Sequence, residues 1–557
     1  MADEIRVYGK KAGGNGVSHC YGIVKRIATA TAASLAVAHL FLPAPLRADV
    51  DPSTLDGKVL FGYQGWFDCP GNWGGYWSHW SGGAPSAANV QVEMYPDLTE
   101  FPKSDLCPAG NFTVGGAPAY FFSSRNLNVI DKHFKWMQGY GLDGVLIQRF
   151  VSDIPGLKGS GDQVLKNILA ASAKYGRVVA IEYDVTGSSF TTWNKNLEDD
   201  WKYLVDQLRI TAAPNYLHHK GKPLVSVWGI GLNESRNPPA NSADAMAMVK
   251  WFHSDAPAAY QASVMGGAPA GFRTSSRDAR KEAGWLDVWK AMDAVQPWNV
   301  GRYTNLNDIK NTYTPSAAAD QKWLAASGIT YMPVLFPGYS QSNAIRGVKK
   351  ANEIPRLGGN FIWQQAVAVK NAGAGAIKIA MFDEVNEATA MFKVVSKRSE
   401  SPAQGYWLAL DGDGMDLPSD WYLRLSAEIT KIHHGVQPAS AVIPINPAEP
   451  YHLGTAVNPV AAASHPAFRW SRMGDGMLFT LDRSGGALEK SMGRLEIRDL
   501  RGMAVRTLSV TGGAALWDMR DEGNRRVTAG MYLARLRVDG TGAGMEEMGK
   551  AEPILAP

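Results

Sequence analysis

The residues that best combine chemistry with spacing are two glutamates three positions apart, Glu384 and Glu387, which follow an apolar run at 377–382. Residues three apart on a helical turn face the same side, so both carboxylates can reach one cleft. Breaking a glycosidic bond needs one protonated and one ionised carboxyl group, and repulsion together with burial separates the pKa values of such a pair. The alternative is a solvated helix start, where the helix dipole favours glutamate. The apolar strand predicted in front of the pair favours the catalytic interpretation.

Polar and aromatic residues at other run ends are weaker candidates for substrate contact. Gln148 and Arg149 close a second apolar run, where an arginine either binds a sugar hydroxyl or forms a structural salt bridge. Glu182 follows a third run and either orients a sugar hydroxyl or holds an arginine. The first loop is rich in tryptophan, which offers either a stacking wall for sugars or core packing. Its tryptophans are Trp66, Trp73, Trp77 and Trp80.

The elements that must position these residues are eight short apolar runs that alternate with helical segments. That alternation is typical of parallel α/β proteins, and eight runs predict a closed (β/α)8 TIM barrel. The runs are 59–63, 144–150, 178–184, 223–228, 261–265, 294–298, 331–336 and 377–382. Helical segments that end at Gly141, Gly176 and Gly328 fit the left-handed C′ position, with Asp162 as the expected cap of the second.

The length of 557 residues exceeds one ordinary core, so we expect several units. They are a leader and signal peptide at 1–48, a catalytic barrel at 49–435, a Pro-rich linker at 436–465, a β-sandwich at 466–545 and a tail at 546–557. Hydrophobic residues make up 45% and charged residues 19%, which is typical of a globular protein. A net charge of +4 without a basic block argues against nucleic acid and favours a neutral polymer as partner.

The start of the chain has the features of an export signal. Lys25 and Arg26 precede a small-residue and apolar segment at 27–42, which is too short and interrupted to span a membrane. Pro43, Pro45 and Leu46-Arg47-Ala48 follow, and we predict cleavage after Ala48. The mature protein is expected to be secreted, periplasmic or on the cell surface, without a membrane span.

The mature chain keeps two cysteines, Cys69 and Cys107. They form either a disulfide, which suits an exported protein, or two buried free thiols. Neither has the CxxC or histidine neighbours of a zinc site, and the Asp/Gly segment at 411–416 departs from the order of an EF-hand loop. We therefore predict no metal and no cofactor.

The segment from Asp383 to Thr389 resembles the last-strand motif of glycoside hydrolase family 99, the endo-acting α-mannosidase type, and more distantly that of the family 71 α-glucanases. The resemblance covers most of residues 55–432, and the paired glutamates are its most specific element. It extends to further segments and implies substrate contacts there. The residues concerned are Tyr63, Glu182, Tyr183, Tyr339, Arg356 and Trp363.

The resemblance implies a metal-free retaining hydrolase of α-linked glycans. Glu384 would take a proton from the substrate's own 2-hydroxyl to form an anhydro-sugar, and Glu387 would act as acid and base at the leaving oxygen. The chain departs from the family pattern at Asp383, usually Asn, at 385–386, usually Trp-His, and at Ala388, usually Gly, and it lacks the acidic end of the motif. These departures spare the glutamates but leave open whether the glycan is an α-mannan or an α-glucan.

After the proline-rich stretch, short alternating strands with glycine turns predict an all-β, immunoglobulin-like sandwich. Segments 500–508, 517–518 and 530–532 resemble the flagellar hook-cap-type module at the C-termini of exported bacterial enzymes. That resemblance implies a partner at the cell surface or in the secretion machinery.

Together these patterns predict a secreted hydrolase whose partner is a poly- or oligosaccharide. The main rival is a non-catalytic glycan-binding or surface-attachment protein that keeps the barrel shape. A lyase or transglycosylase that uses the same pair is a third possibility.

Overall fold

The computed structural model describes residues 49–234 and 241–451, and eight shorter segments nearer the C-terminus. Those segments are 468–473, 476–481, 493–498, 503–510, 514–527, 530–539, 546–548 and 552–556. The predicted leader and signal peptide at 1–48, and the linker beyond residue 451, lie outside the described residues. Within the described part of the chain, no helix combines the length and the apolar character that crossing a membrane requires.

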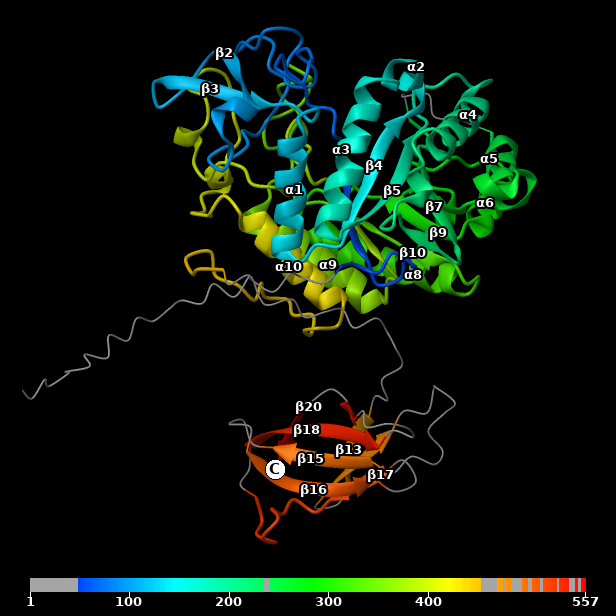
Figure 1. Cartoon of the computed structure of the whole chain (residues 1–557), viewed down its shortest axis with the longest axis vertical. Helices are drawn as coiled ribbons and strands as arrows, with labels where there is room; N and C mark the ends of the chain where they lie inside the picture. The colour runs from blue at the N-terminus through cyan, green and yellow to red at the C-terminus, as the bar shows by residue number, and fades with distance from the viewer. Residues whose placement is uncertain are drawn as a thin grey trace, which may run out of the picture. The chain divides into compact units, whose positions relative to one another are not determined.

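A curled parallel sheet forms the centre of the first part of the chain (Figure 1). Its strands lie in the order β10-β9-β8-β7-β5-β4-β1-β12-β11, with the short β6 (His218–His219) paired to β7. The strands are β1 (Val59–Tyr63), β4 (Gly144–Phe150), β5 (Val178–Asp184), β7 (Lys222–Trp228), β8 (Ser263–Pro269), β9 (Ala294–Trp298), β10 (Thr330–Tyr331), β11 (Val334–Leu335) and β12 (Ile377–Ile379). These strands confirm the predicted α/β barrel class, since buried parallel strands are apolar on both faces.

The two ends of this sheet are consecutive pieces of one predicted strand. β10 pairs with β9 and β11 pairs with β12, and only Met332 and Pro333 separate them. Pro333 has no backbone N–H, so it interrupts the ladder without ending the strand. Its carbonyl accepts a hydrogen bond from Lys378 N at 3.1 Å, while Met332 N donates to Val295 O at 2.9 Å. The broken seventh strand thus joins both sides and closes the sheet into a barrel.

Helices surround the strands, as Figure 1 shows for α3 to α6 around β4, β5, β7 and β9. They are α1 (Leu127–Tyr140), α2 (Ile154–Leu157), α3 (Ser160–Tyr175), α4 (Trp193–Asp206), α5 (Ser242–Lys250), α6 (Trp285–Ala291), α7 (Leu306–Asp308), α8 (Thr314–Ala325), α9 (Asn360–Ala372) and α10 (Trp421–His433). Gly141 and Gly176 end α1 and α3 in the left-handed conformation, as predicted. The prediction of Asp162 as a cap is wrong, because this residue lies inside α3 and pairs with Arg149.

Two strands differ from their predicted limits for local reasons. β8 extends beyond the predicted apolar run through Gly266 and Gly267 to Pro269. A Cβ added at Gly267 would lie 2.6 Å from Trp228 Cα, so glycine permits the close approach of β7. β12 ends at Ile379, three residues before the predicted end of the eighth run, and the chain then turns into the segment with the glutamates.

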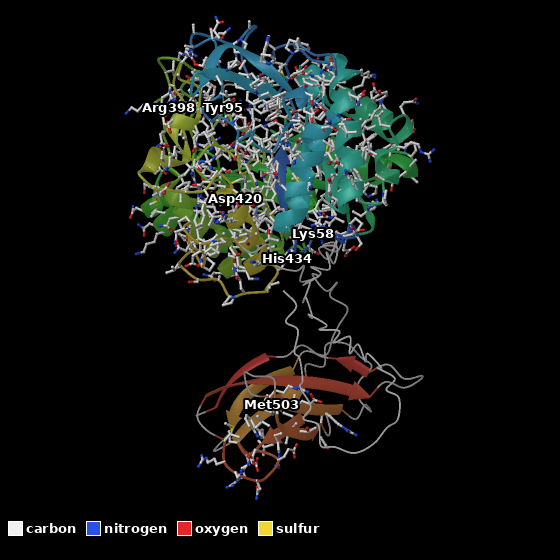
Figure 2. The ribbon with its side chains drawn as sticks, turned by 60° about the vertical axis from the view of Figure 1, so that its left-hand side comes forward. Lys58, Tyr95, Arg398, Asp420, His434 and Met503 are labelled. Atoms are coloured by element: carbon white, nitrogen blue, oxygen red, sulfur yellow. A yellow bond between two sulfur atoms is a disulfide. The ribbon has the colours of Figure 1, made fainter. Side chains whose placement is uncertain are left out.

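The amino-terminal end of the barrel strands is held by Asp143, which precedes β4. Its carboxylate accepts a hydrogen bond from Val59 N at 2.7 Å and lies 2.9 Å from His434 Nε2, just beyond α10. His434 and Lys58, the residue before β1, are labelled in Figure 2. These contacts join the first two strands to the last barrel helix at the end away from the glutamates.

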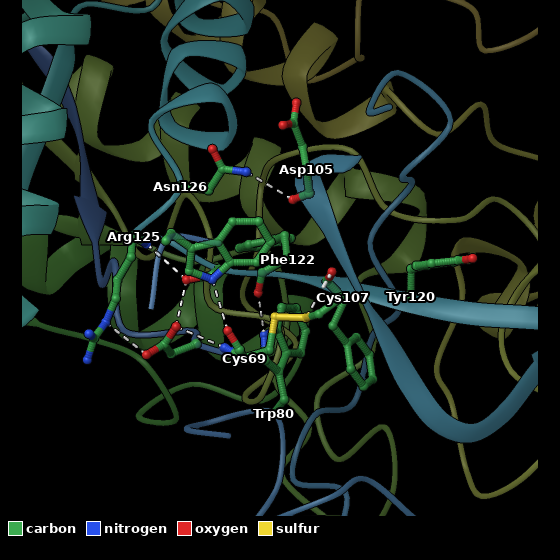
Figure 3. Close-up of a disulfide and its surroundings, with 12 residues drawn as sticks. Cys69, Trp80, Asp105, Cys107, Tyr120, Phe122, Arg125 and Asn126 are labelled. Atoms are coloured by element: carbon green, nitrogen blue, oxygen red, sulfur yellow. Dashed lines mark hydrogen bonds and ion pairs between the residues drawn. A yellow bond between two sulfur atoms is a disulfide. The ribbon is translucent and has the colours of Figure 1, made fainter. Parts of the chain in front are cut away.

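A disulfide joins the loop after β1 to an antiparallel pair, β2 (Leu106–Val114) and β3 (Ala117–Phe122). It links Cys69 and Cys107, whose Cα atoms are 6.4 Å apart (Figure 3). Beside it, Trp80 Nε1 donates to Phe122 O at 2.7 Å. The structure therefore has the disulfide rather than two free thiols, and this bond anchors the tryptophan-rich loop.

The C-terminal segments form two antiparallel sheets. The first contains β13 (Phe468–Met473), β14 (Gly476–Leu481) and β17 (Ala514–Trp517), and the second contains β15 (Gly493–Arg498), β16 (Ala504–Val510), β18 (Gly530–Asp539), β19 (Glu546–Met548) and β20 (Glu552–Ala556). Phe479 and Trp517 of the first share an apolar cluster with Leu495 and Ile497 of the second. Strands β19 and β20 come from residues after 545, where we expected a tail.

Candidate active site

A cavity of about 580 Å³, which we call the rim cavity, opens where the barrel strands end. Residues that close or follow seven of the eight barrel strands line it. The lining includes Gln64, Trp66, Gln148, Glu182, Asp184, Trp228, Glu234, Trp298, Arg302, Tyr339, Gln341, Lys349, Glu353, Glu384 and Glu387. The carboxyl end of the strands is where α/β barrels hold their active sites.

Glu384 is the more deeply placed glutamate of the pair, with 5% of its surface exposed. Gln64 Nε2 donates to one of its carboxylate oxygens at 2.9 Å, and Thr389 Oγ1 donates to the other at 2.7 Å. The backbone around it doubles back tightly, since Thr389 N and Ala390 N both donate to Glu384 O. The two glutamates therefore lie in a non-helical segment of turns and not in the predicted helical turn.

Burial raises the pKa of Glu384 well above its usual range, and the neighbouring carboxylates of Glu387 and Asp383 raise it further. The hydrogen bonds from Thr389 and Gln64 act in the opposite direction but do not outweigh these effects. The two glutamates therefore share one electrostatic environment in which two full negative charges are disfavoured. This is the arrangement that acid and base work by two carboxyl groups requires.

Glu387 is half-buried and is held by the loop that follows β11. Gln341 Nε2 donates to Glu387 Oε1 at 3.0 Å, and Tyr339 in turn donates its hydroxyl proton to Gln341 Oε1 at 2.6 Å. Ser340 N donates to the main-chain carbonyl of Glu387 at 3.0 Å. Side chain and backbone of Glu387 are thus fixed by three consecutive residues of one loop.

Glu93, a fully buried carboxylate, holds this loop in turn. Its oxygens accept hydrogen bonds from Ser340 Oγ at 2.6 Å, from Ser342 Oγ at 3.0 Å and from Asn343 N. Glu93 N also donates to Val385 O, between the two glutamates, at 3.0 Å. Glu93 therefore ties the segment that carries the pair to the loop that orients Glu387. Sequence reasoning missed it, because nothing near Glu93 marks its partners some 250 residues away.

Asp383 fixes the loop after β1 against the pair. Its two carboxylate oxygens accept from Gln64 N at 2.9 Å and Gly65 N at 2.8 Å. Burial raises the pKa of Asp383 to about 6, although these two hydrogen bonds oppose the rise. Gln64, which contacts both Asp383 and Glu384, was not predicted as a site residue.

Another carboxylate in the lining of the rim cavity, Glu182, has the opposite electrostatic setting. It is fully buried and forms an ion pair with Lys378, which lies on β12 and is also fully buried. Gln148, Ser226 and Gln296 donate further hydrogen bonds to it. Burial by itself would raise the pKa of Glu182, but the Lys378 ammonium and the hydrogen bonds from Gln296 and Ser226 outweigh it and lower the pKa.

Two aromatic side chains at strand ends complete the cavity wall. Trp228 closes β7 and Trp298 closes β9, and their rings meet edge to face with centroids 5.1 Å apart. Sequence reasoning did not select them, although both are the last residues of predicted apolar runs. A rule that took the final residue of every run would have found them.

The predicted contact residues divide by position. Trp66, Gln148, Glu182 and Tyr339 line the rim cavity, and Arg149 lines a neighbouring one. The other four, Tyr63, Tyr183, Arg356 and Trp363, line neither.

Those four side chains form hydrogen bonds with the surrounding protein. Tyr63 hydrogen-bonds His133, with 2.8 Å between its hydroxyl and Nδ1, and Tyr183 donates to Asp200 at 2.9 Å. Arg356 donates to the carbonyls of Ala388 and Ala390, at 2.8 and 2.7 Å, and Trp363 Nε1 donates to Ser440 O at 2.8 Å. Arg356 therefore supports the segment after Glu387 rather than reaching the cavity.

Among the described residues, no group of three or more His, Cys, Asp or Glu side chains is placed to hold a metal ion. In the Asp/Gly segment, Asp411 accepts from Arg398 N, and Asp413 accepts from Asn352 Nδ2 at 3.0 Å and from Leu357 N at 2.6 Å. These aspartates thus bind neighbouring loops.

Comparison with solved structures shows the same fold in an endo-α-mannosidase of family 99 from Bacteroides thetaiotaomicron. Its complex with bis-tris-propane is 18% identical, with a TM-score of 0.51 over 70% of this chain and 100% of that chain. A second structure of a family 99 endo-α-mannosidase from this organism gives 18% identity and a TM-score of 0.50, over 69% of this chain and 99% of that chain. A search among curated proteins finds no significant match.

The sequence profile of glycosyl hydrolase family 99 matches residues 54–433, which span the barrel and every residue of the rim cavity. Its match includes both glutamates and the loops that hold them. The chain therefore belongs to glycosyl hydrolase family 99 and is a glycoside hydrolase.

Proposed function

We propose that this protein is an exported, retaining hydrolase of α-linked glycans of the α-mannan or α-glucan type. The observation that carries the proposal is the electrostatically linked pair Glu384 and Glu387 in one cavity at the carboxyl end of the barrel. Family membership supports glycoside hydrolysis, and the similar structures are of endo-α-mannosidases, so α-mannans are the first substrates to test.

In the first half of the proposed reaction, the ionised carboxylate of Glu384 takes the proton of the substrate's 2-hydroxyl. The 2-oxygen then bonds to C1 while the C1 bond to the leaving oxygen breaks, and Glu387 gives its proton to that oxygen. The product is a 1,2-anhydro sugar. The reaction starts from the form of the pair in which the single shared proton is on Glu387, although burial favours the proton on Glu384 at rest. The high proton affinity of Glu384 then suits a base that must remove a proton from an alcohol.

In the second half, the Glu387 carboxylate takes a proton from water as the water oxygen bonds to C1. The C1 bond to the 2-oxygen breaks, and Glu384 returns the proton to that oxygen. Each half inverts C1, so the configuration is retained overall. A route of this kind, assisted by the substrate, is a known exception to the scheme with a covalent enzyme intermediate.

The test is hydrolysis of a panel of α-mannans, α-glucans and mixed α-linked glycans by wild type, Glu384→Gln and Glu387→Gln. Glu282→Gln is the matched control, because Glu282 is exposed, pairs with Arg280 at 3.7 Å and lies outside the lining of the rim cavity. We expect wild type and the control to release products, and each catalytic variant to lose about 10²–10⁴-fold in kcat/KM. A substrate with its 2-hydroxyl methylated should not be cleaved.

If wild type binds these glycans but no variant changes the yield of any product, the catalytic proposal fails. The rival function, a non-catalytic glycan-binding or surface-attachment protein, would then take its place. Cleavage of the 2-O-methyl substrate at the normal rate would reject the role of the 2-hydroxyl while leaving hydrolysis itself intact.

We further propose export with cleavage after Ala48, and an immunoglobulin-like C-terminal module that contacts the cell surface or the secretion machinery. The Cys69–Cys107 disulfide supports an oxidising compartment, and the shared apolar cluster of two antiparallel sheets supports a sandwich. Sequencing the mature amino terminus tests the cleavage site, with Asp49 expected first. Fractionation of cells that express the full chain or a chain ending at residue 451 tests the sorting role.

A further inference from the structure

A second cavity, which we call the side cavity, adjoins the rim cavity and has a volume of about 730 Å³. It lies among the ends of β4 and β5, the loop after β1, and α2 and α3. Its lining includes Ile147, Ile181, Gly156, Val164 and Leu165. A cavity of this size is within the range of small-molecule sites.

The two cavities share part of their walls. Four residues line both, namely Gln64, Trp66, Gln148 and Phe150. Gln64 also donates the hydrogen bond to Glu384, so the shared wall includes a residue that contacts the catalytic pair. A ligand in the rim cavity that carries a side group therefore has a place for it next to the reaction centre.

Trp66 lies in the shared wall of the two cavities and stacks on two other rings. Its ring lies parallel to that of His79, with centroids 4.0 Å apart and planes at 7°, and Phe150 stacks on it at 5.6 Å and 16°. His79 adopts a left-handed backbone with φ of 61°, a conformation that costs roughly 1–2 kcal/mol for a residue with a Cβ. Because rings cover Trp66, it borders the cavities with its edges rather than with an open face.

The two arginines that line the side cavity are paired with carboxylates of the protein. Arg149 pairs with Asp200 and with Asp162, at 2.5 and 3.2 Å, and Arg125 pairs with Asp68 at 2.9 Å. Burial lowers the pKa of His79 to about 4, so its ring is neutral at ordinary pH. The remaining lining is apolar or carries neutral hydroxyl and amide groups, apart from the exposed Asp153, which precedes α2. This composition favours a neutral ligand with apolar faces and polar edges.

Two polar atoms in the shared wall have no hydrogen-bond partner among the described residues. They are the acceptor Gln64 Oε1 and the donor Trp66 Nε1. A buried polar atom without a partner costs about 1–3 kcal/mol, so a ligand hydroxyl that bonds to either atom would remove that cost. One donor and one acceptor suit a sugar hydroxyl, which can both give and accept a hydrogen bond.

We infer that the side cavity receives a neutral sugar branch of the substrate while the main chain lies in the rim cavity. The protein would thus prefer branched over unbranched α-glycans. This inference rests on the proposed glycan substrate, and it adds a specificity site that the acid and base chemistry does not need. A substrate whose main chain carries acyl groups instead of sugars is the competing ligand for the same space.

The test blocks the side cavity with Gly156→Phe. A Cβ added at Gly156 meets no atom within 4 Å, and this glycine in α2 is not in the left-handed region, so a side chain can grow into the open space. The matched control is Gly82→Phe, which has the same two properties but lines neither cavity. Gly156→Leu serves as a milder second variant if Gly156→Phe has a lowered melting temperature.

The substrates are an unbranched α-glycan that wild type cleaves, the same main chain with one sugar branch, and the same main chain with an acyl group. We expect wild type and Gly82→Phe to have a kcat/KM about tenfold higher on the branched glycan, and the Gly156 variants to remove that preference. Their kcat/KM on the unbranched glycan should stay within about twofold of wild type. No branch preference in wild type, an unchanged preference in the Gly156 variants, or a preference for the acylated chain would overturn the inference.

A binding arm separates this inference from the proposed hydrolysis. Calorimetry measures the affinity of wild type and Gly156→Phe for unbranched and singly branched α-mannooligosaccharides of equal main-chain length. Tighter binding of the branched form that Gly156→Phe abolishes, without any cleavage, supports the side cavity and rejects hydrolysis of α-mannans. Cleavage without branch preference supports hydrolysis and rejects the side cavity as a site for a sugar branch.

Discussion

Glu182 and Glu384 are both buried and line the same cavity, yet their pKa values shift in opposite directions. Glu182 faces the Lys378 ammonium and several donors, which hold it ionised. Glu384 faces the carboxylates of Glu387 and Asp383, which add to burial and favour its protonated form. Burial alone therefore does not decide the state of a carboxyl group, because the sign of its nearest neighbours does. One glutamate is a fixed charge in the barrel, and the other is set up to exchange a proton.

The largest expected effect is a loss of stability when the cation beside Glu182, Lys378, is removed. In Lys378→Met, Glu182 would be left as a buried charge without a partner, so we expect a loss of about 3–5 kcal/mol in the free energy of unfolding. Urea unfolding measures it. The double variant Lys378→Met/Glu182→Gln should recover much of the loss, since the stranded charge is gone. Losses that simply add would contradict the pairing of the two side chains.

The support of Glu387 should have the next largest effect. In Glu93→Gln, the carboxylate that accepts from Ser340, Ser342 and Asn343 is replaced by an amide with a single acceptor oxygen. We expect kcat to fall about 10–100-fold with a smaller change in KM, because the loop that orients Glu387 is loosened, at about 1.5–3 kcal/mol for each charged hydrogen bond. Steady-state kinetics at several pH values test this, with Glu282→Gln as control. Unchanged kcat would show that the loop needs no anchor.

The two glutamates should also give opposite pH dependences of stability. Because the pKa of Glu384 is raised in the folded state, this state binds more protons than the unfolded state at pH values between the two pKa values. The contribution of Glu384 to stability therefore falls as pH rises from the unfolded pKa to the folded pKa. The lowered pKa of Glu182 means that its contribution is present above the unfolded pKa and is lost as pH falls below it. Relative to wild type, Glu384→Gln should gain stability as pH rises, and Glu182→Gln as pH falls. Urea midpoints between pH 3 and 8 that run parallel for both variants would contradict this.

The smallest expected effect concerns the backbone beside the pair. Ala388, the residue after Glu387, has a φ of 52°, in the left-handed region, whereas Glu182 lies in a regular strand. Ala388→Gly should relieve the strain, partly offset by a more flexible unfolded chain, and raise the free energy of unfolding by up to about 1 kcal/mol. Thermal unfolding measures the change. A clear loss of stability would mean that the Ala388 side chain contributes more packing than strain.

The barrel could be predicted because buried parallel strands are apolar along their length, and the seventh run was recognisable even though Pro333 divides it. Glu384 and Glu387 could be found because both lie in one short segment. The partners that decide their state could not, since Lys378 and Glu182 are 196 positions apart and Glu93 is 250 from Asn343. Lys378 is the one charged residue in the apolar run at 377–382, and Asp162 was expected to be a helix cap. Both are halves of ion pairs. The closed barrel brings Glu182 to Lys378, and the packing of α3 beside the end of β4 brings Asp162 to Arg149.

The central claim is the division of labour between the two glutamates, and leaving-group dependence tests it most directly. An acid is needed for a poor leaving group but not for a good one, whereas the base is needed for both. We would compare kcat/KM of Glu384→Gln and Glu387→Gln on an α-glycan and on an aryl α-glycoside of the same sugar with an acidic phenol as leaving group. Glu387→Gln should lose about 10²–10⁴-fold on the glycan but much less on the aryl glycoside, and Glu384→Gln should lose on both. The reverse pattern, or equal losses for both variants on both substrates, would contradict the account.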